Sequence, residues 1–207
     1  MAHIPYGPTE FQRDTGVSRE TLARLSAFAD LLLKWNKRVN LIGRDTENHL
    51  WHRHILDSAQ LSALIPMEAA SIADIGAGAG PPGLILSILN TSAQIRLIES
   101  DRRKAAFLRE AIRVTQSSAI VHESRVEEVD LPPQNVVIAR ACAPLDRLLE
   151  MVQKLVSIHT VCIFPKGAQA EQELTAARQH WKMQVRQVPS RTDPAGRILV
   201  LTEVARV

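Results

Sequence analysis

The chain has 207 residues, of which 45% are hydrophobic and 23% charged, and a formal net charge of +3 at pH 7. This length suits one domain with a sizeable core and a small extension. No apolar run reaches the roughly 18 residues of a membrane-spanning helix, and the N-terminus lacks the pattern of a signal peptide. We therefore expect a cytoplasmic protein with no membrane partner. The mild positive charge permits a nucleic-acid partner without requiring one.

Two parts are predicted along the chain, an N-terminal extension over residues 1–66 and a larger domain over residues 67–207, together forming one compact unit. Proline and glycine punctuate residues 1–16, so we expect a loosely tied arm there. From Ser18, an N-cap residue, apolar residues recur at helical spacing to a helix end near Gly43. A second helix is predicted over residues 45–64.

The end of the first predicted helix is basic, with Lys34, Lys37 and Arg38 around Trp35. These cations suit a solvated last turn, where they favour the helix dipole. The same cluster also suits an RNA-facing surface, because phosphates take the charge and an aromatic ring can stack on a base. Both interpretations remain open from the sequence.

His54 and Asp57 lie three residues apart in the second predicted helix. At this spacing the two side chains share a helix face, where they can hydrogen-bond to each other. A histidine–aspartate pair is compatible with catalysis, but the pattern favours a structural pair that anchors the helix to the larger domain.

A strand, a glycine-rich turn and a helix follow one another over residues 71–89. Residues 78–83 match the dinucleotide pattern G-x-G-x-x-G. However, Pro81 and Pro82 have no N–H group for a pyrophosphate. The carboxylate of Asp74 lies just before Gly76 and suits a cation better than a phosphate. Because S-adenosylmethionine carries an ammonium and a sulfonium, we predict this methyl donor as the cofactor.

The next predicted strand, residues 94–99, ends in Glu99, which lies 23 residues after Gly76. This is about the separation that places a carboxylate on a ribose in a βαβ unit. Arg103 and Lys104 then lie in the first turn of a helix, where they oppose its dipole. Val126 and Glu127 follow a third strand, in the region where this architecture usually holds an adenine ring.

The remaining pattern alternates strands and helices and ends in a hairpin. Strands are predicted over residues 135–140, 160–164, 184–188 and 197–204, helices over 145–156 and 170–180, and a loop over 189–196. This order predicts an α/β fold with a seven-stranded doubly wound sheet, the class I S-adenosylmethionine-dependent methyltransferase fold.

The fourth predicted strand ends in Arg140-Ala-Cys-Ala-Pro144, which differs from the proline-rich motif of enzymes that methylate exocyclic amines. Cys142 is compatible with a thiolate nucleophile for cytosine C5 methylation. Its alanine neighbours favour a small packing residue instead. Neither Cys142 nor Cys162 has the spacing of a metal or redox site, and we expect no bound metal.

Several stretches, in order, resemble the RsmG (GidB) family, which methylates N7 of a guanine in the 530 loop of bacterial 16S rRNA. They are Trp35-Asn-Lys37, His54-x-x-Asp57-Ser58, Asp74-x-Gly76-x-Gly78-x-Gly80, Glu99-Ser100, Arg125-Val-Glu-Glu128, Arg140-Ala141 and Lys166-Gly167. The resemblance runs from about residue 30 to the C-terminus. It implies 16S rRNA as the partner, within the small ribosomal subunit or an assembly precursor, and we expect a monomer.

The resemblance also implies the functional residues. The family's cofactor contacts fall on Gly76, Pro81, Val126, Glu127 and Arg140, and the general fold adds Asp74, Gly78 and Glu99. Pro81 departs from the large apolar residue usual in the family, and Asn135 replaces its usual aspartate.

Guanine N7 has a lone pair and no proton, so its methylation needs no general base and depends on positioning. We expect Arg140 and Lys166 to position base or phosphate. Candidate RNA contacts, each also interpretable as ordinary surface charge, are Lys34, Lys37, Arg38, Arg53, His54, Arg103, Lys104 and Arg197. A methyltransferase acting on another RNA, a protein or a small molecule, and a non-catalytic RNA-binding relative, remain alternatives.

Overall fold

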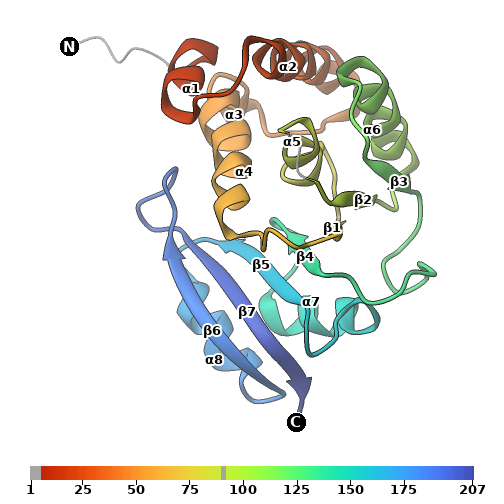
Figure 1. Cartoon of the computed structure of the whole chain (residues 1–207), viewed down its shortest axis with the longest axis vertical. Helices are drawn as coiled ribbons and strands as arrows, with labels where there is room; N and C mark the ends of the chain where they lie inside the picture. The colour runs from red at the N-terminus through yellow and green to blue at the C-terminus, as the bar shows by residue number, and fades with distance from the viewer. Residues whose placement is uncertain (1–5, 90–91) are drawn as a thin grey trace.

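The computed structural model describes residues 6–89 and 92–207 and is organised around one seven-stranded sheet (Figure 1). The strand order is β3-β2-β1-β4-β5-β7-β6, parallel except for β7, which runs antiparallel to both neighbours. The strands are β1 Ser71–Ile75, β2 Gln94–Ile98, β3 Ile120–His122, β4 Val136–Ala139, β5 Val161–Lys166, β6 Trp181–Pro189 and β7 Arg197–Arg206. The predicted fold class is confirmed. No helix in the described part of the chain is long and apolar enough to cross a bilayer.

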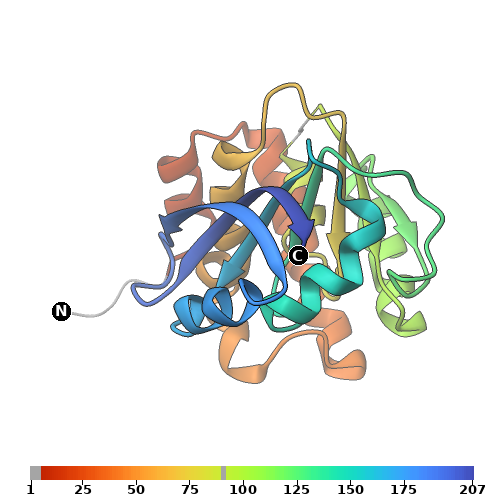
Figure 2. The same cartoon turned by 90° about the horizontal axis from the view of Figure 1, so that it is seen from below.

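Helices cover both faces of the sheet. The covering helices are α1 Pro8–Thr15, α2 Arg19–Val39, α5 Gly83–Ile88 and α6 Arg102–Thr115 on one face, and α7 Leu145–Val152, α8 Ala170–Ala177 and the short 3-10 helix η3 Gln153–Leu155 on the other (Figures 1 and 2). Successive strand residues point to opposite faces, so Val136 packs with the first group and Val137 with the second. Buried side chains of α1 and α2 join the same core as β1 and β2, so the extension packs directly on the sheet.

The expected loose arm is wrong over residues 8–15, which form α1. Pro8 is the first helical residue and Gly16 ends the helix with φ of 68°. Proline at a helix start and glycine just past its end are boundary signals, and the sequence interpretation took them for loop residues. Phe11 is fully buried and fixes α1 to the core. Residues 1–5 of the predicted arm lie outside the described residues.

The second helix predicted over residues 45–64 is wrong as one continuous element. The chain forms α3 Arg44–Glu47, a turn, the π-helix η1 Trp51–Leu56, α4 Asp57–Ala59 and the 3-10 helix η2 Gln60–Leu64. Hydrophobic periodicity does not separate α-helical from wider or tighter windings, because their spacings are close to one another. The first predicted helix, α2, ends at Val39, four residues before the predicted end near Gly43, and its C-cap Asn40 adopts a left-handed φ of 54°.

Candidate functional site

A cavity of about 660 Å³ opens at the carboxyl ends of β1, β4 and β5. This is the crevice where open α/β sheets bind their ligands. Most of its lining comes from the glycine loop (residues 76–83), the segment 140–144 after β4, the extension, and the β6–β7 loop (residues 189–196). Residues 165–167, Glu173 of α8 and the first two residues of β7 complete it. The cavity therefore combines the expected cofactor loop with residues of the N-terminal extension.

The glycine loop has the backbone conformation that its sequence predicts. Gly76, Gly78 and Gly80 have φ values of 66°, 54° and 100°, which L-residues with side chains rarely adopt. A Cβ atom on Gly76 would lie 3.2 Å from the Sγ of Cys142. The loop and the segment after β4 therefore approach each other closely at one wall of the cavity.

Asp74 lies beneath the glycine loop, whereas we expected its carboxylate beside the bound group. The side chain is fully buried, and its Oδ2 accepts the N–H of Gly83 at 2.8 Å. Burial raises the pKa of this carboxyl from 3.8 to about 7. A Cβ on Gly83 would lie 2.6 Å from Oδ2, so glycine is needed there for this close approach. The difference arises because residues of β1 are covered on both faces of the sheet.

Glu99 also holds the glycine loop. Its Oε2 accepts the N–H of Gly78 at 2.8 Å and its Oε1 accepts the N–H of Asp101 at 2.7 Å. Its side chain is buried at the end of β2. Asp74, Glu99, Val126 and Glu127 are not among the described residues that line the cavity, whereas Gly76, Gly78, Pro81 and Arg140 are.

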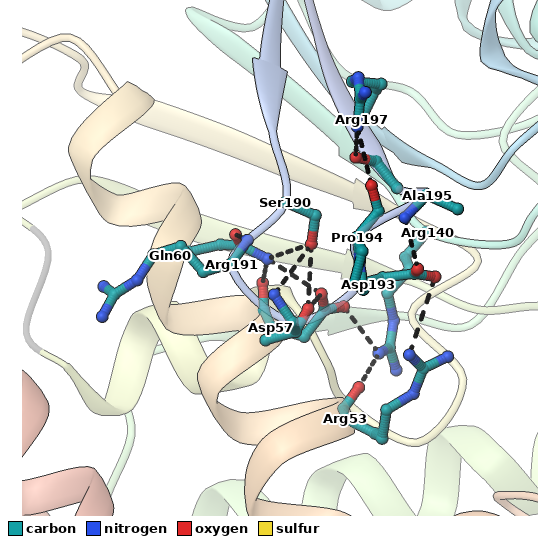
Figure 3. A network of polar contacts seen from close by, with 12 residues as sticks. Arg53, Asp57, Gln60, Arg140, Ser190, Arg191, Asp193, Pro194, Ala195 and Arg197 are labelled. Atoms are coloured by element: carbon teal, nitrogen blue, oxygen red, sulfur yellow. Dashed lines mark hydrogen bonds and ion pairs between the residues drawn. The ribbon is translucent and has the colours of Figure 1, made fainter.

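Arg140 joins the end of β4 to the extension (Figure 3). Its Nη1 donates to the carbonyl oxygen of Arg53 at 3.0 Å and lies 3.3 Å from Oδ2 of Asp57. Its Nη2 lies 2.9 Å from Nδ1 of His54, which accepts because a guanidinium only donates. Arg140 therefore lies between His54 and Asp57, and the direct hydrogen bond expected between those two is replaced by contacts of each with Arg140.

His54 is neutral in this arrangement. Its side chain is buried, and burial together with the charge of Arg140 lowers its pKa from 6.5 to about 4. A neutral imidazole that accepts at Nδ1 carries its proton on Nε2. The neutral charge state allows the ring to contact a cation without charge repulsion.

Asp57 also fixes the β6–β7 loop. Thr192 donates its hydroxyl hydrogen to Oδ1 of Asp57, and the backbone N–H of Arg191 donates to Oε1 of Gln60 at 2.9 Å. Asp193 lies 3.8 Å from the guanidinium of Arg53. Figure 3 shows these side chains meeting where the loop crosses the extension. The sequence predicted residues 189–196 only as a loop between two strands and gave no indication that this loop contacts the extension. The one related signal was the polar pair His54 and Asp57.

Lys166 is held within the protein. Its ammonium donates to the carbonyl oxygen of Ala143 at 2.7 Å and lies 2.8 Å from Oε2 of Glu173, and its side chain is 10% exposed. The same Glu173 oxygen accepts the N–H of Leu145 at 2.8 Å. Lys166 and Glu173 together fix the segment after β4, in which Ala141 has a φ of 50°. Glu173 is a further residue that sequence reasoning missed, because it lies on a different element, α8.

Cys142 lines the cavity and is half-buried. Burial raises its pKa, and the nearby carboxylate of Asp74 raises it further. A thiol with a raised pKa is a poor source of thiolate at neutral pH. The geometry therefore favours the packing interpretation of Cys142.

The predicted RNA contacts fall into three places. Arg53, His54 and Arg197 line the cavity, whereas Lys34, Lys37 and Arg38 lie near the end of α2, and Arg103 and Lys104 begin α6.

Trp35 and Asp101 affect how the basic residues of α2 and α6 are interpreted. The ring of Trp35 packs edge-on against Phe107, with ring centroids 5.7 Å apart, and its half-buried side chain packs against the core. Asp101 caps α6 by accepting the N–H groups of Arg103 and Lys104, which offsets the unfavourable position of these two cations.

Comparisons with known proteins identify the family. The family model described as rRNA small subunit methyltransferase G (GidB) matches residues 21–197. The chain belongs to this family. It is 51% identical over 197 residues to "Ribosomal RNA small subunit methyltransferase G" of Rhodospirillum centenum, covering 95% of this chain and 91% of the relative. It is 49% identical over 200 residues to the protein of that name from Paramagnetospirillum magneticum, covering 97% of each.

Solved structures with low sequence identity share the fold. An O-methyltransferase from Bacillus cereus superposes with a TM-score of 0.59 at 14% identity, covering 93% of this chain and 96% of that one. A ribosomal protein L11 methylase from Lactobacillus delbrueckii gives a TM-score of 0.58 at 10% identity, covering 78% of this chain and 80% of that one. The predicted family, methyltransferase class and fold are confirmed.

Proposed function

We propose that this protein transfers a methyl group from S-adenosylmethionine to N7 of a guanine in the 530 loop of 16S rRNA. The observation that carries the proposal is family membership over residues 21–197, which include every described residue that lines the cavity except Ile198. The substrate is the 16S rRNA of the small ribosomal subunit or of an assembly precursor. We further propose that the protein acts as a monomer in the cytoplasm, where small subunits are assembled.

The residues of the cavity fit the methyl donor. Gly76 is exposed in the cavity and the ring of Pro81 lines it, so both are placed to contact an adenosyl group. Asp74 and Glu99 hold the loop from behind through the N–H groups of Gly83 and Gly78. The bound donor supplies an electrophilic methyl group on a sulfonium sulfur. The task of the protein is to orient that methyl group and the base.

The side chains around the cavity are suited to positioning rather than to proton transfer. His54 is neutral and accepts from Arg140, and the thiol of Cys142 stays protonated at neutral pH. Guanine N7 attacks with its lone pair, so no proton has to leave that atom. Holding nucleophile and methyl group close and collinear then provides most of the acceleration.

Arg140 is the residue we assign to substrate or cofactor contact. Its contacts with Arg53, His54 and Asp57 engage three of the five N–H donors of a guanidinium, and it lines the cavity. Two donors are therefore available to a bound group. Lys166 lines the same cavity, but its ammonium is held by Glu173 and Ala143, so we assign it to positioning the segment after β4.

The test is methylation of purified small subunits from cells that lack this gene, with protein-free 16S rRNA and free nucleotides as alternative substrates. We expect one 7-methylguanosine in the 530 loop, mapped by strand scission at that base, and no product with free nucleotides. Methylation of a protein or a metabolite would support the alternative enzyme classes. A calorimetric titration without S-adenosylmethionine binding would support the non-catalytic relative.

A further inference from the structure

A second hollow of about 530 Å³ lies between the end of α2 and α3. The residues that line it are Asn36, Lys37, Arg38, Asn40, Arg44 and Glu47. Figure 2 shows the orange segment that contains α3 beyond the carboxyl ends of the parallel strands. The residues that line the cavity lie at the same end of the sheet. We call this feature the basic hollow.

The basic hollow and the cavity share one wall. Along the turn from α2 into α3, Leu41, Ile42 and Thr46 line the cavity. Asn40 and Arg44, from the same turn, line the basic hollow. The two concave surfaces are therefore separated by the thickness of a single stretch of chain.

The side chain of Asn36 fixes this wall. Its Oδ1 accepts the N–H of Ile42 at 2.8 Å as well as that of Leu41, and its Nδ2 donates to the carbonyl oxygen of Ile42 at 3.1 Å. Nδ2 also donates to Oε1 of Glu47 at 2.6 Å. Asn36 is buried, so these contacts are shielded from water. These hydrogen bonds fix the backbone of the wall in one conformation.

The basic hollow carries a net positive charge. Lys37, Arg38 and Arg44 contribute three positive charges, and Glu47, the only acidic residue among the described residues that line it, contributes one negative charge and accepts from Asn36. Within residues 6–89 and 92–207, no ion pair involves any of the three cations. The three cations are exposed and available to an anion.

Helix stability accounts for only part of this arrangement. Lys37 and Arg38 lie in the last turn of α2, where cations favour the helix dipole. Arg44 lies in α3, a single turn of four residues whose dipole is too small to favour a cation. The dipole therefore explains neither Arg44 nor the grouping of all three cations around one hollow.

We propose that the basic hollow binds a backbone phosphate of the RNA, next to the nucleotide whose base enters the cavity. This inference rests on the proposed function. Enzymes that modify a base take it out of its stack, while the flanking phosphates stay at the mouth of the site. Phosphate contacts fix the register of the nucleic acid and leave recognition to the base contacts. Arg44, which sequence reasoning did not select, joins Lys37 and Arg38 in this role.

The test compares two triple variants that remove the same charge. One is Lys37→Ala/Arg38→Ala/Arg44→Ala, and the matched control is Arg178→Ala/Lys182→Ala/Arg186→Ala, which removes three exposed cations from the end of α8 and from β6. Binding of 16S rRNA and of unmodified small subunits is measured over a range of salt concentrations. Each phosphate contact on single-stranded RNA contributes about 0.7 to the slope of log affinity against log salt.

We expect the hollow variant to lose about 0.7 from this slope, as for one phosphate contact. It should bind RNA at least tenfold more weakly at low salt, while S-adenosylmethionine affinity and thermal stability stay near those of the wild type. The control variant should keep the slope, and Arg44→Lys should keep it as well because the charge is retained. An unchanged slope in the hollow variant, or an equal loss in the control, would overturn the assignment. The binding assay does not require methyl transfer. Its result can therefore be distinguished from a failure of the wild type to methylate 16S rRNA.

Discussion

Asp57 offers the sharpest test of how the extension completes the cavity. Its Oδ2 lies 3.3 Å from Nη1 of Arg140, and its Oδ1 accepts from Thr192 and, at 2.9 Å, from Nε2 of Gln60. The side chains of Asp57 and Arg140 are only 16% and 20% exposed. The change Asp57→Ala removes the only carboxylate that pairs with Arg140 in the described part of the chain and leaves the Thr192 hydroxyl without this acceptor.

The expected loss of stability follows from these contacts. Removing one partner of a buried ion pair costs roughly 3–5 kcal/mol, and a hydrogen bond to a charged group contributes about 1.5–3 kcal/mol. Arg140 keeps some solvent contact and its bonds to Arg53 and His54, so we take the lower end, about 3 kcal/mol for Asp57→Ala. Asp57→Asn keeps an oxygen for Thr192 but turns an amide N–H donor towards Arg140, and should cost about 2 kcal/mol.

Urea unfolding measures this loss, with the exposed Asp130→Asn as a control expected within about 0.5 kcal/mol of the wild type. A double-mutant cycle of Asp57→Ala with Arg140→Ala should give a coupling energy of at least about 1 kcal/mol. Because Arg140 is displaced, methyl transfer should fall more than tenfold in kcat/KM. A cost below 0.5 kcal/mol with no coupling would refute the view that Asp57 positions Arg140.

Three further predictions concern the floor and wall of the cavity. Gly83→Ala should lower the free energy of unfolding by about 3 kcal/mol through overpacking against Asp74, whereas Gly167→Ala, where a Cβ meets nothing within 4 Å, should be tolerated in the same denaturation assay. Burial raises the pKa of Asp74 in the folded protein to about 7. Without ligand, the free energy of unfolding of the wild type relative to Asp74→Asn should therefore fall between pH 4 and pH 7, by up to about 1.4 kcal/mol per pH unit. Parallel pH profiles of the two proteins would contradict this. Iodoacetamide at pH 8 should alkylate Cys142 slowly and Cys162 not at all, because burial raises the pKa of Cys162 to about 12. Peptide mass spectrometry measures the extent of alkylation at each cysteine. Saturating S-adenosylmethionine should protect Cys142 from alkylation.

The sheet and its glycine loop are predictable from the sequence because their signals are local. Alternating apolar runs mark the strands, and glycine and proline mark the turns between them. The extension is less predictable because its signals have two meanings. Pro8 and Gly16 bound a helix just as they would punctuate an arm, and only the burial of Phe11 against the core decides between the two.

The cavity was predicted in part. The positions of Gly76, Gly78 and Arg140 follow from the motifs, because carboxyl ends of parallel strands meet at one edge of a sheet. The partners of Lys166 and Asp57 could not be predicted, since Glu173 and Thr192 are brought to them by tertiary packing from elements distant in the chain. Sequence spacing reports on neighbours along one helix or strand and carries no signal for such pairs.

The hydrogen bonds of the glycine loop argue against a dinucleotide independently of the family. A pyrophosphate site needs free backbone N–H groups in the loop. The N–H of Gly78 donates to Glu99, that of Gly83 to Asp74 and that of Gly80 to the carbonyl oxygen of Ala77. The two prolines at 81 and 82 have none to offer.

The two carboxylates therefore bear on specificity through the glycine loop that they hold. By accepting the N–H groups of Gly78 and Gly83, Glu99 and Asp74 remove the donors that a phosphate would use. They also place negative charge behind the loop whenever they are ionised, and this charge opposes an anion and favours a cationic ligand. The glycine loop matches a dinucleotide motif in sequence. Because Asp74 and Glu99 occupy its N–H groups and add negative charge, it suits a positively charged methyl donor instead.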